Sequence, residues 1–158
     1  MTTLDRSEFL GVYHNTSPSS QAEVPFRVAI KRNVPGSATD YTNYGYVKTE
    51  VAAAMVYNLY AVLRFGKGAI LNDVQPTADD LSAYEDFINA KPLRRERQIE
   101  SREKYKAVTA AGHTFRTHIK LREEQAQQAA TQAEALAKAN AEIPEGDASP
   151  ILPAAAAA

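Results

Sequence analysis

The feature that most constrains this chain is a stretch of about fifty residues, 93–143, in which almost nothing interrupts a helix. Good helix formers dominate it, and Gly112 is its one strong helix breaker. A continuous helix of that length would run roughly 75 Å. A compact body built from residues 1–90 would be only about 30 Å across. We therefore expect a small body that carries a helical arm longer than itself.

A break at residues 111–114 is the alternative, and it would give a helical hairpin whose second helix is capped by Thr114. We favour the continuous helix. The expected organisation is then a globular body over 1–90, a long helix over 91–143 that is first basic and then rich in alanine, and a Pro/Ala tail over 144–158.

The body is expected to combine helices with a minor β element, which makes the fold class mainly α. Residues 25–34 alternate between apolar and polar side chains and predict a strand. Residues 69–74 predict a second short strand that pairs with it. Helices are expected over residues 47–65 and 78–88, the second capped by Thr77. Residues 12–20 and 37–46 are rich in turn-forming or polar side chains and are expected to be irregular.

One helix of the body is apolar almost all round. Between Glu50 and Arg64 it has thirteen residues, broken only by the polar Asn58. A membrane span needs roughly 20 apolar residues. We therefore expect a central buried helix, with no membrane span.

A seven-residue repeat runs along the second half of the chain. It predicts a coiled-coil-like seam of mostly small side chains, although Gly112, Arg122 and Asn140 are poor seam residues. Most helix stability in proteins comes from packing, so the arm needs a partner surface: copies of itself, another subunit, or its own body if the hairpin forms. The residues expected to contact a partner are Phe115, Ile119, Ala126, Ala133, Leu136 and Ile143, with Tyr41, Tyr44 and Tyr46 as a second patch.

The charges are segregated, although the formal net charge is only −1. Residues 91–124 carry 10 basic and 5 acidic side chains. A basic stripe of this kind can neutralise nucleic-acid phosphates, but interspersed glutamates are typical of a solvated helix face. The residues that a nucleic-acid function would use are Arg94, Arg95, Arg97, Arg102, Lys104 and Lys106.

Few patterns in the chain point to chemistry. There is no cysteine, and His113 and His118 lie five residues apart, which puts them on different faces of one helix, so no metal or cofactor is expected. An acidic cluster could share acid and base work, but first turns and polar faces of helices produce the same pattern. Its members are Asp73, Asp79, Asp80, Glu85 and Asp86. The N-terminus does not resemble a secretory signal, since charges occupy its first ten residues.

These observations predict a non-enzymatic structural or connector subunit of a large assembly, a homo- or hetero-oligomer in a virion or in the cytoplasm. A small body with an Ala/Gln-rich helical arm is typical of structural proteins in bacteriophage particles. The alternative is a nucleic-acid-binding accessory protein that uses residues 91–124.

Overall fold

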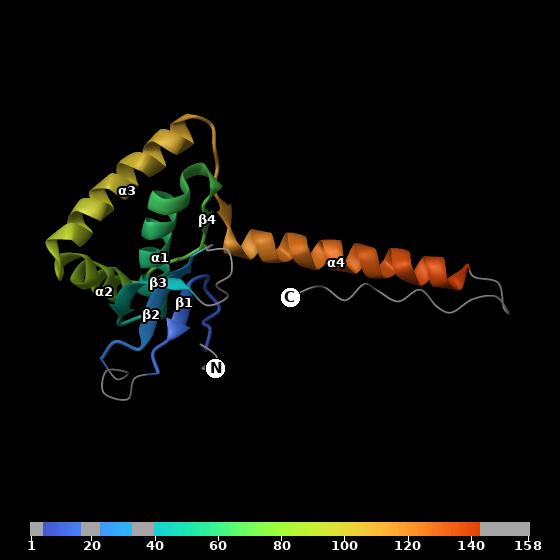
Figure 1. The fold of residues 1–158 in the computed structure, drawn as a ribbon, viewed down its shortest axis with the longest axis horizontal. Coiled ribbons are helices and arrows are strands. Elements are labelled where there is room, and N and C mark those ends of the chain that lie inside the picture. The colour runs from blue at the N-terminus through green and yellow to red at the C-terminus, as the bar shows by residue number, and fades with distance from the viewer. Residues whose placement is uncertain (1–4, 17–22, 33–39, 143–158) are drawn as a thin grey trace. The chain divides into compact units, whose positions relative to one another are not determined.

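The computed structural model describes residues 5–16, 23–32 and 40–142 (Figure 1). The chain divides into two compact units, Met1–Ile119 and Lys120–Ala158. The elements follow one another as β1 (Val12–His14), β2 (Phe26–Lys31), β3 (Tyr41–Val47), α1 (Glu50–Phe65), a short 3₁₀ turn (Gly66–Gly68), β4 (Ile70–Leu71), α2 (Ala78–Asn89), α3 (Pro92–Ala110), β5 (Arg116–Thr117) and α4 (His118–Ala141). The expected class is confirmed: mainly α with minor β, an α+β body followed by a long C-terminal helix.

Three antiparallel strands form the sheet of the body, in the order β1-β2-β3. The strand expected over residues 25–34 is β2. The other two fall in segments expected to be irregular, so that expectation is wrong for both. A β-bulge between Val28 and Ala29 interrupts the register of β2 with β3. Because a bulge shifts the apolar–polar alternation, β3 does not show the period of two by which a strand is recognised.

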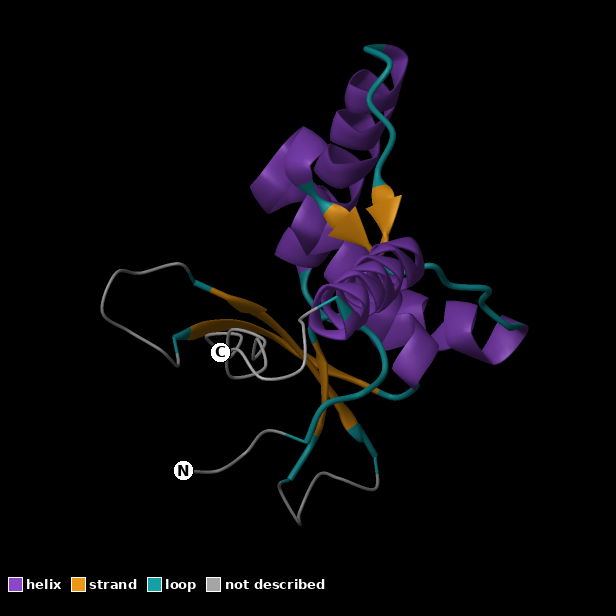
Figure 2. Ribbon diagram, turned by 90° about the vertical axis from the view of Figure 1, so that its right-hand side faces the viewer, coloured by secondary structure: helices purple, strands orange, loops and turns teal. Residues whose placement is uncertain are grey.

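β4 has a different partner from the one expected. It pairs in parallel with β5, with Ile70 opposite Arg116 and Leu71 opposite Thr117. Figure 2 shows these two short strands apart from the three-stranded sheet. The predicted pairing of residues 69–74 with residues 25–34 is therefore wrong. β4 pairs instead with β5, which lies in the segment that the sequence pattern predicts to be helical.

α1 is the central buried helix that the sequence predicts. Thr49 caps its N-terminus by accepting a hydrogen bond from the Ala52 amide at 3.2 Å, and Gly66 ends it with a positive φ of 54°. The helix contacts all three strands of the sheet and also α2 and α3. Its interior is closely packed and mostly of small side chains; the buried members are Ala52, Ala53, Ala54, Val56, Tyr57, Leu59, Ala61 and Val62.

The one polar residue in this apolar run has a structural role. The Asn58 side chain accepts a hydrogen bond from the Asn72 amide at 2.7 Å and donates one to the Asn72 carbonyl at 3.0 Å. Asn72 is itself buried, and its side chain makes the same pair of bonds with the backbone of Leu10. Two asparagines thus link α1, the segment after β4 and the segment before β1.

The expected continuous helix over 91–143 is wrong. α3 ends at Ala110, and Gly112 follows with a φ of 82°. The Gly112 amide donates to the Thr109 carbonyl (3.0 Å) and the His113 amide to the Val108 carbonyl (3.2 Å). These two bonds form a Schellman motif, which ends a helix by satisfying its last carbonyls. The break lies where the hairpin alternative puts it, but α4 begins at His118, so Thr114 is not its N-cap.

α3 belongs to the body, which therefore extends past residue 90 to Ile119. Ser101 donates a hydrogen bond to the Leu59 carbonyl at 3.1 Å, and Lys104 donates to the Leu63 carbonyl at 2.9 Å. Both bonds join α3 to α1, since both acceptors lie in α1. A helix that the charge pattern assigned to an arm is thus anchored along the core helix.

Candidate functional site

α4 is a 24-residue helix in which no described side chain is buried. Alanine, glutamine and glutamate give it high intrinsic helix propensity. Lys138 and Glu134 form an i,i+4 ion pair at 3.6 Å, with both side chains about three-quarters exposed (76% and 73%). Such a pair contributes only about 0.2–0.5 kcal/mol. The described side chains of α4 are thus exposed or half-buried, and none is fully buried.

The predicted partner-contact residues on α4 share one side of the helix, because their spacings of seven and three residues return to the same face. Ile119 is 47% exposed and Leu136 is half-buried, and between them Ala126 and Ala133 are exposed. Ile143 lies outside the described residues. We call Ile119, Ala126, Ala133 and Leu136 the α4 seam.

Phe115 does not belong to this helix. It precedes β5 and is partly buried against the core of the body. Its ring stacks on Tyr105 of α3, with ring centroids 5.0 Å apart and planes 19° apart. This residue therefore packs within its own unit, and it joins α3 to the segment that follows the helix break.

The predicted tyrosine patch on β3 does not form one surface. Tyr41 packs edge-on against Tyr13, with ring centroids 5.9 Å apart. Tyr44 stacks on Tyr60 of α1 at 4.0 Å, and Tyr46 alone is exposed, at 41%. Two of the three rings thus contribute to internal packing.

Among the predicted basic residues, Arg94 is the one most enclosed by its own fold. Its guanidinium lies 3.7 Å from the centre of the Phe87 ring and donates a 2.9 Å hydrogen bond to the Phe87 carbonyl. Burial lowers the pKa of Arg94, but a guanidinium stays protonated at neutral pH. This cation therefore holds α3 against α2, and little of it is available for a phosphate.

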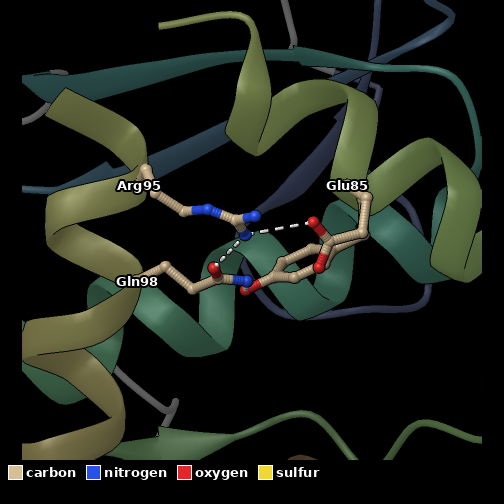
Figure 3. Close-up of polar contacts among 4 residues, drawn as sticks. Glu85, Arg95 and Gln98 are labelled. Atoms are coloured by element: carbon tan, nitrogen blue, oxygen red, sulfur yellow. Dashed lines mark hydrogen bonds and ion pairs between the residues drawn. The ribbon is translucent and has the colours of Figure 1, made fainter. Parts of the chain in front are cut away.

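Three of the remaining five basic side chains also have partners within the body. Arg95 contacts Glu85 at 3.2 Å and Gln98 at 2.9 Å, as Figure 3 shows. Arg97 pairs with Glu100 at 2.7 Å. Lys104 donates to α1, as described above.

The other two, Arg102 and Lys106, are exposed and line a groove between α1 and α3. The predicted basic stripe is therefore mostly a set of intramolecular contacts.

The acidic cluster is dispersed in the same way. Asp80 accepts a 2.9 Å hydrogen bond from the Thr77 amide and completes a capping box at the start of α2. That backbone hydrogen bond holds the pKa of Asp80 below its usual value. Glu85 pairs with Arg95, and Asp86 pairs with Lys48 at 3.6 Å. These carboxylates serve helix ends and surface ion pairs, which is the structural alternative that the sequence left open.

A cavity of about 490 Å³ lies in the body, in a place that sequence reasoning missed. Its polar lining comes from the segment before β1, from all three strands and from α1, and consists of Arg6, Tyr13, Lys31, Tyr41 and Tyr57. These residues are spread over fifty positions of the chain and share no motif. The tertiary fold alone brings them together. We call this space the tyrosine cavity.

Within the described residues there is no group of three or more His, Asp or Glu side chains placed to hold a metal ion. None of the described helices has both the length and the apolar character needed to cross a bilayer. Comparison with protein-family models, with curated proteins and with solved structures finds no match to this chain.

Proposed function

We propose that this protein is a non-enzymatic structural or connector subunit of a large assembly, of the kind found in bacteriophage virions. In this proposal the α4 seam packs against helices of neighbouring subunits. The observation that supports it most directly is α4 itself, a 24-residue helix without a single buried side chain in its described length. Because helices in proteins owe most of their stability to packing, a helix of this kind gains most from a surface outside its own chain.

The chemistry of the seam suits close helix pairing. Alanine side chains at Ala126 and Ala133 let the backbone of a second helix approach closely, while Ile119 and Leu136 supply larger apolar groups near each end. Among the described α-helices, α4 is the one without a buried side chain, since α1, α2 and α3 each bury residues in the body.

The magnitudes favour an assembly over an isolated pair. Because Ile119 is 47% exposed and Leu136 is already half-buried, completing their burial contributes about half of the roughly 1.5–3 kcal/mol that a fully exposed side chain would gain. Bringing two free molecules together costs about 4–15 kcal/mol. One seam contact therefore gives weak association between free chains. It becomes strong when other contacts already hold the subunits side by side, because the local concentration is then in the millimolar range.

Truncation and seam substitution test the proposal together. Deleting residues 125–158 should leave a folded monomer, because the core lies within Met1–Ile119. In sedimentation velocity over micromolar to millimolar concentrations, the full chain should show reversible, concentration-dependent association that the truncated chain lacks. A full chain that stays monomeric throughout this range would overturn the proposal.

A pair of double variants separates the seam from the rest of the helix. Ala126→Glu with Ala133→Glu places two charges in the seam and should abolish association. Gln128→Glu with Ala135→Glu adds the same two charges at the same spacing, but on the opposite side of the helix, and should leave association intact. Equal effects of the two pairs would show that net charge, and not the seam, controls assembly.

A further inference from the structure

The tyrosine cavity has the size of a small-molecule site. Its volume of about 490 Å³ lies within the range of about 300–1,000 Å³ that is usual for ligand pockets. Apolar side chains form part of the wall, chiefly Leu10, Phe65 and Ile70. All of its lining residues belong to the first unit of the chain.

One glycine makes the floor of the cavity possible. Gly11 has a φ of 75°, and a Cβ atom there would lie 2.1 Å from the Tyr57 ring. No side chain can occupy that position while Tyr57 stays where it is. The absence of a side chain at Gly11 thus lets Tyr57 reach from α1 to the strand that begins at Val12.

The polar groups of the wall are arranged around one phenol. Tyr13 is buried, its ring packs edge-on against Tyr41, and its backbone pairs with that of Arg6 in an isolated antiparallel bridge. Burial raises the pKa of Tyr57 to about 12 and also raises the pKa of Tyr13. Both phenols are therefore neutral at physiological pH and keep the hydrogen that a phenol donates to an acceptor.

Among the described residues, the formal charge of the lining is entirely positive. Arg6 and Lys31 contribute two cations, and the described lining residues include no carboxylate. Asp40, which precedes Tyr41 in the chain, is paired with Arg32 at 3.6 Å. A concave wall that carries one sign of charge concentrates the field and attracts ions of the opposite sign.

We propose that the tyrosine cavity binds a small organic anion with a carboxylate or phosphate group. Arg6, Lys31 and the phenol hydroxyls hold the charged group, and the aromatic and aliphatic wall accepts the rest of the molecule. This site is separate from the α4 seam in residues and in chemistry, so the two proposals stand or fall independently.

Calorimetric titration of the full chain with four probes tests the ligand class. Benzoate and phenyl phosphate carry the two candidate head groups on the same ring. Benzyl alcohol removes the charge, and inorganic phosphate removes the ring. We expect saturable binding of benzoate or phenyl phosphate, and at least about tenfold weaker binding of the other two. Absence of saturable binding by both organic anions overturns the proposal, and so does inorganic phosphate binding as tightly as phenyl phosphate.

Three variants locate the site. Lys31→Gln should weaken anion binding about tenfold. Gly68→Leu should block it, because Gly68 lines the cavity and a Cβ there meets nothing within 4 Å, which leaves space for a side chain at this point of the wall. The matched control is Lys48→Gln, an exposed lysine outside the lining, which should bind as the parent does. If binding survives both cavity variants, the anion binds elsewhere and the assignment is wrong.

Discussion

At the scale of a single residue, the contact between the Arg94 guanidinium and the Phe87 ring shows how the fold determines the role of a charged side chain. In the sequence, Arg94 is one of several basic residues in a mixed-charge helix. In the structure it contacts the Phe87 ring and the Phe87 carbonyl. Nothing in the local pattern separates it from Arg97, whose partner is a glutamate on the same helix face. The difference comes from which residues the fold places opposite each of them.

We expect Arg94→Ala to lower the free energy of unfolding by about 2 kcal/mol. The variant loses a cation–π contact, worth about 0.5–2 kcal/mol, and a hydrogen bond from a charged donor. Arg97→Ala removes an exposed i,i+3 pair and should cost no more than about 0.5 kcal/mol. Urea denaturation followed by circular dichroism measures both. Equal costs for the two variants would show that Arg94 is a surface charge.

Tyr57 gives a pH-dependent prediction at the same scale. Its pKa is about 12 in the folded chain and about 10 in an unfolded one. A raised folded-state pKa stabilises the fold fully below pH 10, and that contribution is lost as the pH rises from 10 through 12. Part of the alkaline fall in unfolding free energy should therefore disappear in Tyr57→Phe. The exposed Tyr46→Phe variant should keep the parent's pH profile, and if it also flattens the profile, Tyr57 is not the cause.

At the scale of elements, the sequence predicts those whose signal is local. The strand β2 alternates, α1 carries caps and a continuous apolar run, and α2 begins with a capping box, so all three could be predicted. β1, β3 and β5 depend on pairing with distant residues, and local pattern alone did not predict them. The break after α3 could be predicted only in part. Gly112 marks its position, but one glycine is compatible both with a continuous helix and with a helical hairpin.

Gly112→Ala tests why the long helix breaks. Its φ of 82° costs a residue with a Cβ roughly 1–2 kcal/mol, so we expect unfolding free energy to fall by about 1 kcal/mol. Gly68→Ala is the control, because Gly68 has no positive φ and a Cβ there meets nothing within 4 Å. A rise in both stability and helix content for Gly112→Ala would mean that the continuous helix is the preferred state.

At the scale of the whole molecule, the chain is a body to Ile119 and a second unit that follows it. Composition predicts the long helix α4, because an alanine-rich stretch needs only high helix propensity to form one. It predicts the body's boundary poorly, since α3 is polar by sequence and yet is joined to α1 through Ser101 and Lys104. The tyrosine cavity could not be predicted, because its polar residues come from five separate segments.

The narrow space at Gly45 ties two distant positions together. A Cβ atom there would lie 2.8 Å from the Phe87 ring and 2.9 Å from the Arg94 guanidinium, on a backbone with a φ of 135°. Any larger residue at position 45 would displace the arginine that joins α2 to α3. In homologues with this fold the glycine should therefore be kept wherever the arginine is kept. Loss of the glycine should force the arginine to change, whereas loss of the arginine should not by itself free position 45, because the backbone φ and the Phe87 ring still exclude a side chain.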